Sequence, residues 1–144
     1  MLFSVAAMAR EVVMSKIRVL LADDHPTILE RVSEILAEDL DVVGAANNGR
    51  DAVAEAERLD PDVLVIDISM PILNGLQAAT RMRAAKRRAK IIFLTVQRDR
   101  DFVAAALSAG AFGYVAKADV TTDLVPAIRE ALQGRTYVSR SIPP

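Results

Sequence analysis

The chain has 144 residues and a net charge of −1 at neutral pH, and 52% of its residues are hydrophobic while 26% are charged. These values predict a single domain with a buried core, and they argue against general disorder and against a global attraction to nucleic acid. The absence of cysteine excludes disulfides and thiolate zinc sites, and no apolar run reaches the roughly 18 residues that a membrane span needs, so we expect a cytoplasmic protein.

The first fifteen residues are largely apolar, but Arg10 and Glu11 interrupt the run and no basic segment precedes it. A secretory signal peptide needs a basic start followed by an uninterrupted apolar stretch. We therefore expect residues 1–15 to form a flexible N-terminal extension, with a docking segment as the alternative, and residues 16–134 to form the folded domain.

Five short apolar runs rich in β-branched residues follow, and each predicts a buried strand. They cover residues 17–22, 42–46, 63–66, 91–96 and 112–116. Apolar residues recur at helical spacing between these runs, in segments that begin at Pro26 or cover residues 49–59, 76–85, 99–109 and 122–133. Strands that alternate with helices predict a single α/β domain of the (βα)₅ type, with a parallel sheet that helices cover on both faces.

Two features near the C-terminus fit this pattern less well. Pro126 lies inside the predicted helix at residues 122–133, where its missing N–H is costly unless the helix begins later. Residues 135–144 end in Ser-Ile-Pro-Pro, which is typical of a linker or of a truncated end.

Polar side chains stand at the carboxyl ends of four of the five predicted strands. They are Asp23 and Asp24 after the first strand, Asp67 after the third, Thr95 at the end of the fourth and Lys117 after the fifth. Functional sites of open α/β sheets form at this edge. A single aspartate after a strand is commonly only a helix cap, but the convergence of these groups predicts a site.

The residue types at this edge favour phosphoryl transfer. Carboxylates brought close together raise one another's pKa unless a cation neutralises them. Asp24, Asp67 and a nearby carbonyl make a sparse oxygen site, which suits Mg²⁺ better than calcium or zinc. Lys117 supplies positive charge for an anion and Thr95 supplies a hydroxyl for a phosphoryl oxygen, so Asp67 is the predicted nucleophile.

The same motifs resemble the receiver domain of two-component response regulators. The matching stretches are ADDHP at residues 22–26, DVLVIDISMPILNG at 62–75, IIFLT at 91–95 and GAFGYVAKA at 110–118, and the resemblance covers residues 16–134. It implies a flavodoxin-like, doubly wound parallel sheet with the strand order 2-1-3-4-5.

The subtype resembles the NarL/FixJ group of regulators, which carry a LuxR-type helix-turn-helix domain. The Asp-Asp-His-Pro start, the pair Lys117-Ala118 and the ending Gly-Arg-Thr-Tyr-Val-Ser at residues 134–139 carry this resemblance. It implies that residues 135–144 lead toward a DNA-binding domain missing from this chain. DNA would then be contacted, and transcription regulated, only through that domain.

The resemblance also implies the chemistry of the site. Asp67 would be the phosphoacceptor, and it would take the phosphoryl group from a sensor histidine kinase. Mg²⁺ would be held by Asp24, Asp67 and the backbone carbonyl of Ser69, with Asp23 acting mainly through water.

The resemblance further implies how the signal leaves the site. Thr95 and Lys117 would assist catalysis, and Thr95 and Tyr114 would form the switch. Thr95 would move toward the phosphoryl group, and Tyr114 would turn into the space it vacates. The expected outcome is a phosphorylation-linked change in homodimerisation, for which a coupling free energy of roughly 1–3 kcal/mol is enough.

Two alternative functions remain open from the sequence. A haloacid-dehalogenase-like phosphatase also uses an aspartate nucleophile and Mg²⁺, but it carries a second aspartate two positions later, where this chain has Ser69. The other alternative is an unphosphorylated pseudo-receiver that acts as an interaction module, although every key residue is present.

We expect a signalling switch and not an enzyme. We also expect His25 to take no part in the chemistry and the basic run at residues 81–90 to be a solvated surface.

Overall fold

The computed structural model describes residues 17–143, so the extension predicted at residues 1–15 lies outside the described part of the chain. Within it, six strands form one sheet with the order β2-β1-β3-β4-β5-β6, and every neighbouring pair is parallel. The predicted fold class and the predicted order of the first five strands are therefore confirmed.

The strands are β1 (Arg18–Ala22), β2 (Asp41–Ala46), β3 (Val63–Ile66), β4 (Lys90–Thr95), β5 (Gly113–Ala116) and β6 (Tyr137–Val138). The helices are α2 (Pro26–Ala37), α3 (Gly49–Leu59), α4 (Gly75–Ala84), α5 (Arg100–Ser108) and α6 (Val120–Leu132), with a short 3₁₀ turn η1 (Lys117–Asp119).

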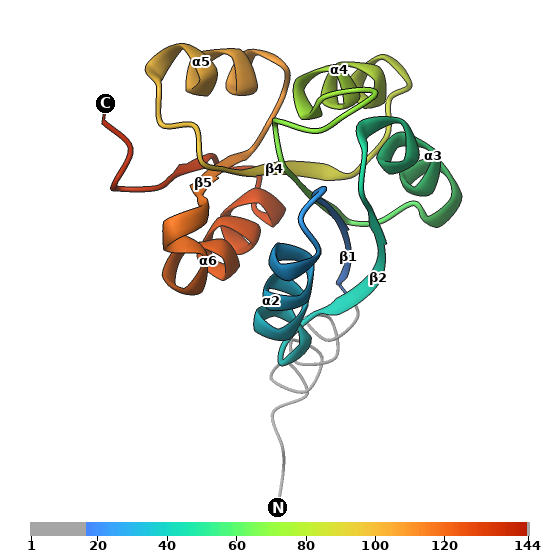
Figure 1. Cartoon of the computed structure of the whole chain (residues 1–144), viewed down its shortest axis with the longest axis horizontal. Helices are drawn as coiled ribbons and strands as arrows, with labels where there is room; N and C mark the ends of the chain where they lie inside the picture. The colour runs from blue at the N-terminus through green and yellow to red at the C-terminus, as the bar shows by residue number, and fades with distance from the viewer. Residues whose placement is uncertain (1–16, 144) are drawn as a thin grey trace, which may run out of the picture.

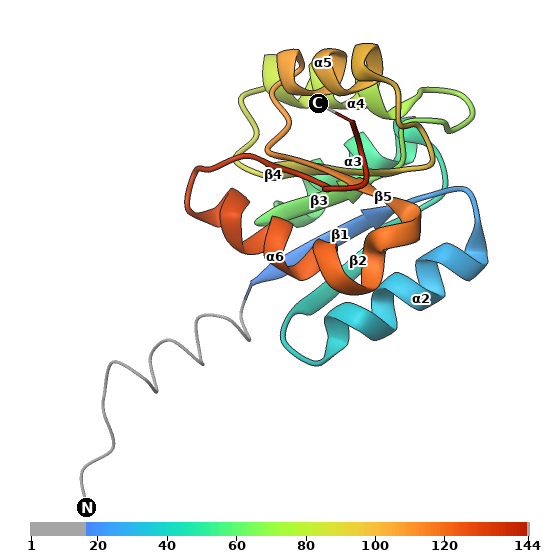
Figure 2. The same cartoon turned by 90° about the vertical axis from the view of Figure 1, so that its left-hand side faces the viewer.

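Two layers of helices cover the sheet, as Figures 1 and 2 show from two sides. Helices α2 and α6 lie on one face, and α3, α4 and α5 lie on the other. Because both faces are covered, β3 in the middle of the sheet is buried at every position, whereas the edge strand β2 is only partly buried. In the described part of the chain, no helix has the length and apolar character needed to cross a membrane.

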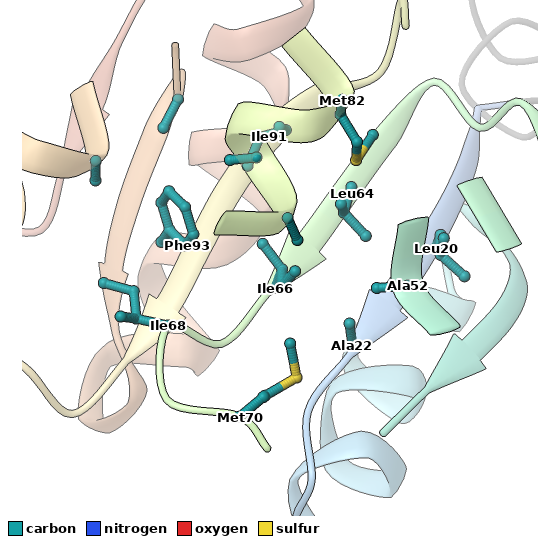
Figure 3. Close-up of a cluster of buried hydrophobic side chains, with 14 of the residues drawn as sticks. Leu20, Ala22, Ala52, Leu64, Ile66, Ile68, Met70, Met82, Ile91 and Phe93 are labelled. Carbon is teal, nitrogen blue, oxygen red and sulfur yellow. The ribbon is translucent and has the colours of Figure 1, made fainter. Parts of the chain in front are cut away.

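An apolar cluster between the sheet and helices α3, α4 and α5 supports the carboxyl end of β3 (Figure 3). Leu64 and Ile66 of β3 and Phe93 of β4 are fully buried in it. Met70 lies on the loop after β3 and turns its side chain back toward this cluster (Figure 3). Burial of a side chain of this size contributes about 1.5–3 kcal/mol, so the packing holds the loop that follows Asp67 against the sheet.

The last helix begins earlier than the sequence predicted. Helix α6 starts at Val120, so Pro126 lies inside the helix and a later start does not explain it. Leu124 and Ile128 of this helix are fully buried while Pro126 is exposed. Burial of two such side chains, at about 1.5–3 kcal/mol each, offsets the roughly 3 kcal/mol that a proline costs inside a helix.

The sheet has a sixth strand that the sequence did not predict. Strand β6 pairs with β5, and Ser139 and Ile142 beyond it are buried. Part of the linker or truncated end predicted at residues 135–144 is thus packed on the domain. Two residues are too few for an alternating pattern to be recognised. That the chain leads from here to a DNA-binding domain stays a prediction.

Candidate functional site

The pairing of β1 with β3 brings Asp23 and Asp67 together. Ala22 pairs with Ile66 in this register, so the residues that follow them leave the sheet side by side. The Asp67 amide donates to the Ala22 carbonyl at 2.9 Å. Both aspartates are buried, with 3% of each residue exposed. Two of the predicted site residues therefore meet at the carboxyl end of the sheet.

Lys117 follows β5 and reaches both carboxylates. Its Nζ lies 2.7 Å from Asp23 Oδ2 and 3.1 Å from Asp67 Oδ2, and 11% of its side chain is exposed. Burial by itself lowers the pKa of Lys117, but the contact with Asp23 and the charges of both carboxylates outweigh burial and raise that pKa. Lys117 is therefore a cation at neutral pH.

The Asp67 carboxylate has a raised pKa, first because burial disfavours its charged form. The charge of Lys117 opposes this effect by lowering the pKa, and the charge of Asp23 adds to it. Asp67 Oδ1 accepts a hydrogen bond from the Ser69 amide at 3.2 Å, while Oδ2 faces Lys117. One cation thus serves two buried carboxylates, and the site keeps an excess of negative charge.

The donor set at the site fits a divalent cation. Ligand atoms of Asp23, Asp24, His25 and Asp67 all lie within 4.8 Å of one another. Asp23 Oδ2 accepts no hydrogen bond in the described part of the chain, because its contact with Lys117 falls outside hydrogen-bond geometry. Closely spaced carboxylate oxygens are suitable ligands for a hard cation, either directly or through its bound water. These residues therefore fit Mg²⁺, the ion that the sequence predicted.

His25 contacts the site more closely than the sequence indicated. Its backbone amide donates to Asp23 Oδ1 at 2.9 Å. Its Nδ1 lies 2.9 Å from the same oxygen and 3.1 Å from Asp24 Oδ1, although the side chain is largely exposed. These contacts orient the Asp23 carboxylate. The available signal was the spacing Asp23-x-His25 at a turn, because aspartate commonly accepts from the amide two residues later.

Gln97 connects the two predicted switch residues. Thr95 is fully buried at the end of β4, and its hydroxyl oxygen accepts from the Gln97 amide at 3.1 Å. Tyr114 on β5 is also fully buried, and its hydroxyl donates to the Gln97 carbonyl at 2.8 Å. Burial, with smaller contributions from the charges of Asp99 and Asp67, raises the pKa of Tyr114 to about 12. The connection uses only the backbone of Gln97, so no residue type in the sequence could have revealed it.

The loop between β3 and α4 is held by a helix cap and a close backbone approach. Asn74 and Gln77 form a reciprocal capping box, in which Asn74 Oδ1 accepts from the Gln77 amide at 2.9 Å. A Cβ atom on Gly75 would lie only 2.2 Å from the carbonyl oxygen of Asp67. The dipeptide Asn74-Gly75 therefore fixes the backbone beside the candidate phosphoacceptor, and only glycine fits at the second position.

Ile72 in the same loop has a φ of 70° and is 67% exposed. A β-branched residue in the left-handed region costs about 1–2 kcal/mol. We expect Ile72→Gly to raise the free energy of unfolding by about 1 kcal/mol, measured by urea denaturation. Val96→Gly is the matched control, because Val96 is 68% exposed but lies outside the left-handed region, and it should not stabilise the protein. A less stable Ile72→Gly variant would show that this φ carries no strain.

Sequence comparison relates the chain to signalling proteins. The response regulator receiver domain family matches residues 19–129. The chain is 35% identical over 128 residues to the nitrate/nitrite response regulator protein NarL of Escherichia coli K12. This alignment covers 88% of this chain and 59% of NarL. It is also 35% identical over 128 residues to the response regulator GacA of Pseudomonas aeruginosa, which covers 88% of this chain and 60% of GacA. The chain thus spans about three fifths of the length of these curated relatives.

Solved structures share the fold. A LuxR-family two-component response regulator from Aurantimonas sp. SI85-9A1 aligns with a TM-score of 0.84 and 32% identity, covering 89% of this chain and 93% of that one. The isolated REC domain of RcsB from Salmonella enterica serovar Typhimurium, determined with the phosphomimetic BeF₃⁻, aligns with a TM-score of 0.81 and 26% identity, covering 88% and 96% of the two chains.

Proposed function

This chain belongs to the family of response regulator receiver domains, and from this premise we propose that Asp67 accepts a phosphoryl group from a sensor histidine kinase and thereby switches the surface of the domain. The observation that carries the proposal is the buried Asp67 carboxylate, which pairs with the same Lys117 ammonium group as the buried Asp23 carboxylate. A carboxylate in these surroundings can act as a nucleophile toward phosphorus.

In the proposed reaction, a carboxylate oxygen of Asp67 attacks the phosphorus atom of a phosphohistidine. The P–O bond forms as the P–N bond breaks, and the imidazole leaves with the bonding electron pair. Lys117 Nζ, 3.1 Å from Asp67 Oδ2, is placed to stabilise negative charge on the phosphoryl oxygens. Because the Ser69 amide holds Oδ1, the carboxylate is oriented before the donor arrives.

The acidic residues around Asp67 would hold a magnesium ion. We assign Asp24, Asp67 and the Ser69 backbone carbonyl as its ligands, with Asp23 acting mainly through water. When bound, Mg²⁺ supplies positive charge that offsets the repulsion between the phosphoryl oxygens and the carboxylates. His25 keeps Asp23 oriented toward this position through its amide and its Nδ1.

Thr95 would couple phosphorylation to the surface. A phosphoryl group adds about −1.5 to −2 charge and three strong acceptors, so the Thr95 hydroxyl, whose oxygen now accepts from the Gln97 amide, would gain an acceptor to which its own O–H can donate. A movement of Thr95 toward that acceptor would also move the Gln97 backbone, whose carbonyl accepts from the Tyr114 hydroxyl. The Tyr114 ring is fully buried in this structure, and its turn on phosphorylation stays a prediction. The proposed change therefore passes through Gln97.

Thr95→Val should keep phosphorylation of Asp67 by acetyl phosphate but lose the change in dimer affinity, because valine has the shape of threonine and no hydroxyl to donate. For the wild-type chain, phosphorylation should alter the dimer dissociation constant by about 5- to 150-fold. Sedimentation velocity with and without acetyl phosphate and Mg²⁺ measures this change. Thr95→Ser, which retains the hydroxyl, is the control and should respond like the wild type. A valine variant that dimerises normally would exclude the hydroxyl as the trigger.

The relatives support an output in transcription. YxjL of Bacillus subtilis, 37% identical over 121 residues that cover 83% of this chain and 56% of YxjL, is named a transcriptional regulatory protein. RcsB, whose chain aligns with a TM-score of 0.81 and 27% identity over 88% of this chain and 65% of its own, has been solved in complex with DNA. We propose that this protein reaches DNA through a helix-turn-helix domain that residues 17–143 do not contain.

The stoichiometry of phosphorylation separates this switch from its alternatives. With acetyl phosphate and Mg²⁺, the switch should gain one phosphoryl group per chain and should not turn over an excess of p-nitrophenyl phosphate. A haloacid-dehalogenase-like phosphatase would turn that ester over many times, and a pseudo-receiver would gain no phosphoryl group. Ser69 supports the switch, because it stands where the phosphatase needs its second aspartate.

A further inference from the structure

A hollow of about 490 Å³ opens at the amino edge of the sheet, where β4 and β5 begin and which lies opposite the phosphorylation site. The buried side chains of Met82 and Ile91 contribute to its apolar part. Four basic residues also line it, Arg83, Arg87, Arg88 and Lys90. We call these six residues the basic hollow, because they combine positive charge with an apolar, concave surface.

Part of the positive charge in the basic hollow has no acidic partner. Arg87 and Arg88 form ion pairs with acidic residues of α3 and of the loop that follows it. Arg83 and Lys90 belong to no ion pair in the described part of the chain. Arg83 Nη1 donates to the Ser108 carbonyl at 2.9 Å, which holds the guanidinium in place and leaves its other N–H groups for a partner. The basic hollow is therefore suited to a partner that carries negative charge.

The C-terminal end of α2 carries the opposite charge. Glu34 lies in the last turn of this helix, and Glu38 and Asp39 follow the helix directly. All three side chains are exposed, and within residues 17–143 none of them forms an ion pair. The C-terminal end of a helix carries a partial negative charge, so acidic residues are unfavourable there, and the last turn of α2 has no basic residue to offset them. These three residues, here called the acidic end of α2, thus lack the cation that would stabilise them.

The basic hollow and the acidic end of α2 share an edge of the sheet but lie on opposite faces. Helix α2 belongs to one helix layer, and α4, which carries Arg83, belongs to the other (Figure 2). Both helices end at the amino edge, because β2 follows α2 and β4 follows α4. The sheet therefore separates the two surfaces within one chain. A half-turn about an axis along this edge exchanges the two faces, so a second copy related by that symmetry brings each surface toward its opposite, and the contact is made twice.

We propose that the basic hollow is a docking site for the acidic end of α2 in a second copy of this chain. Charge complementarity supports this occupant, because one chain exposes both halves of the contact and each half has charges without an ion-pair partner. The proposal gives part of the basic run at residues 81–90 a role beyond the solvated surface that the sequence predicted. It does not rest on the proposed function, because Asp67 follows β3 at the other edge of the sheet. A contact between opposite charges is weakened by salt.

Sedimentation equilibrium of the whole chain, without Mg²⁺ and without a phosphodonor, tests the proposal. We expect the average mass to rise toward that of a dimer as the protein concentration increases to about 1 mM in about 0.01 M salt. In about 1 M salt, where the Debye length is about 3 Å, the chain should return to a monomer. A chain that stays monomeric at low salt, or that associates equally well at high salt, would overturn the proposal.

Charge reversal identifies the two surfaces. Glu34→Lys with Glu38→Lys, and separately Arg83→Glu with Lys90→Glu, should each lower the self-association constant by at least about tenfold, because like charges then face each other. The four substitutions in one chain cancel in charge and keep the net charge of −1. This fourfold variant should associate to within about tenfold of the wild type, because opposite charges again face each other. A fourfold variant that is folded by circular dichroism but stays monomeric would contradict the contact.

Asp101→Lys is the matched control for Glu34→Lys alone. Asp101 is exposed on α5, close to the end of that helix that follows β4, and it belongs to no ion pair in the part of the chain that the structure describes. Its reversal changes the net charge as much as Glu34→Lys does but leaves both surfaces intact, so the self-association constant should stay within about twofold of the wild type. An equal loss in the two variants would show that overall charge drives the association, and it would exclude the docking of α2.

Discussion

Asp67→Asn should gain no phosphoryl group from acetyl phosphate and Mg²⁺, whereas the wild-type chain should gain one. The asparagine keeps the size of the aspartate, but its amide is a far poorer nucleophile than a carboxylate. The measurement is the intact mass of the protein before and after incubation. The effect should be a complete loss, because both oxygens of the other buried carboxylate, Asp23, already have close partners, His25 at Oδ1 and Lys117 at Oδ2.

Asp41→Asn is the control for this experiment. Asp41 is an exposed aspartate on the edge strand β2, and its replacement should leave labelling at the wild-type level. Persistent label on folded Asp67→Asn would show that another residue accepts the phosphoryl group, and it would remove Asp67 from that role.

Lys117→Met should lower the free energy of unfolding by about 3 kcal/mol at neutral pH without Mg²⁺. The substitution keeps an unbranched side chain but removes the cation that lies within 3.1 Å of both buried carboxylates. Asp23 and Asp67 would then repel each other in a site with little solvent. Urea denaturation followed by circular dichroism measures the change.

Three comparisons identify the cause of this loss. Lys90→Met is the control, because Lys90 belongs to no ion pair in the described part of the chain and its Nζ lies 4.3 Å from the centre of the Phe112 ring, so its loss should cost at most about 1 kcal/mol. Asp67→Asn added to Lys117→Met should recover much of the stability, because it removes one of the repelling charges. Mg²⁺ should recover part of it. A Lys117→Met variant as stable as the wild type would show that the ion pairs contribute nothing to folding.

The pH dependence of Lys117→Met follows from the pKa of Asp67. Burial already raises that pKa, and removal of Lys117 takes away the charge that lowers it. A raised carboxyl pKa means that the folded state binds a proton more readily than the unfolded state does, so stability rises as the pH falls through the raised pKa. The difference between Lys117→Met and the wild type should therefore shrink on acidification, and a difference that grows would contradict this origin.

The parallel sheet and the site at its carboxyl edge could be predicted because each depends on strong, local signals. The buried strand Val63–Ile66 is bounded as predicted, and so is α3, which Asn48 caps by accepting from the Asp51 amide. Once the strand order was assumed, residues that follow β1, β3 and β5 had to converge. Lys117 does contact both Asp23 and Asp67, as this convergence predicts.

The features that the sequence did not reveal depend on contacts between distant residues. Strand β6 is two residues long, and only its pairing with β5 makes it a strand. Pro126 sits within a helix because burial of Leu124 and Ile128 outweighs its cost, and a local rule for proline does not include that burial. Gln97 connects Thr95 with Tyr114 only through its backbone amide and carbonyl, so its residue type carries no signal.

Location of the phosphoryl group on the wild-type chain tests the proposed function most directly. The protein would be incubated with acetyl phosphate and Mg²⁺, the acyl phosphate would be reduced with borohydride, and the modified residue would be identified by tandem mass spectrometry. We expect close to one modification per chain, at Asp67 and not at Asp23 or Asp24. Modification at a different residue, or none in a folded sample, would contradict the assignment of Asp67 as the phosphoacceptor.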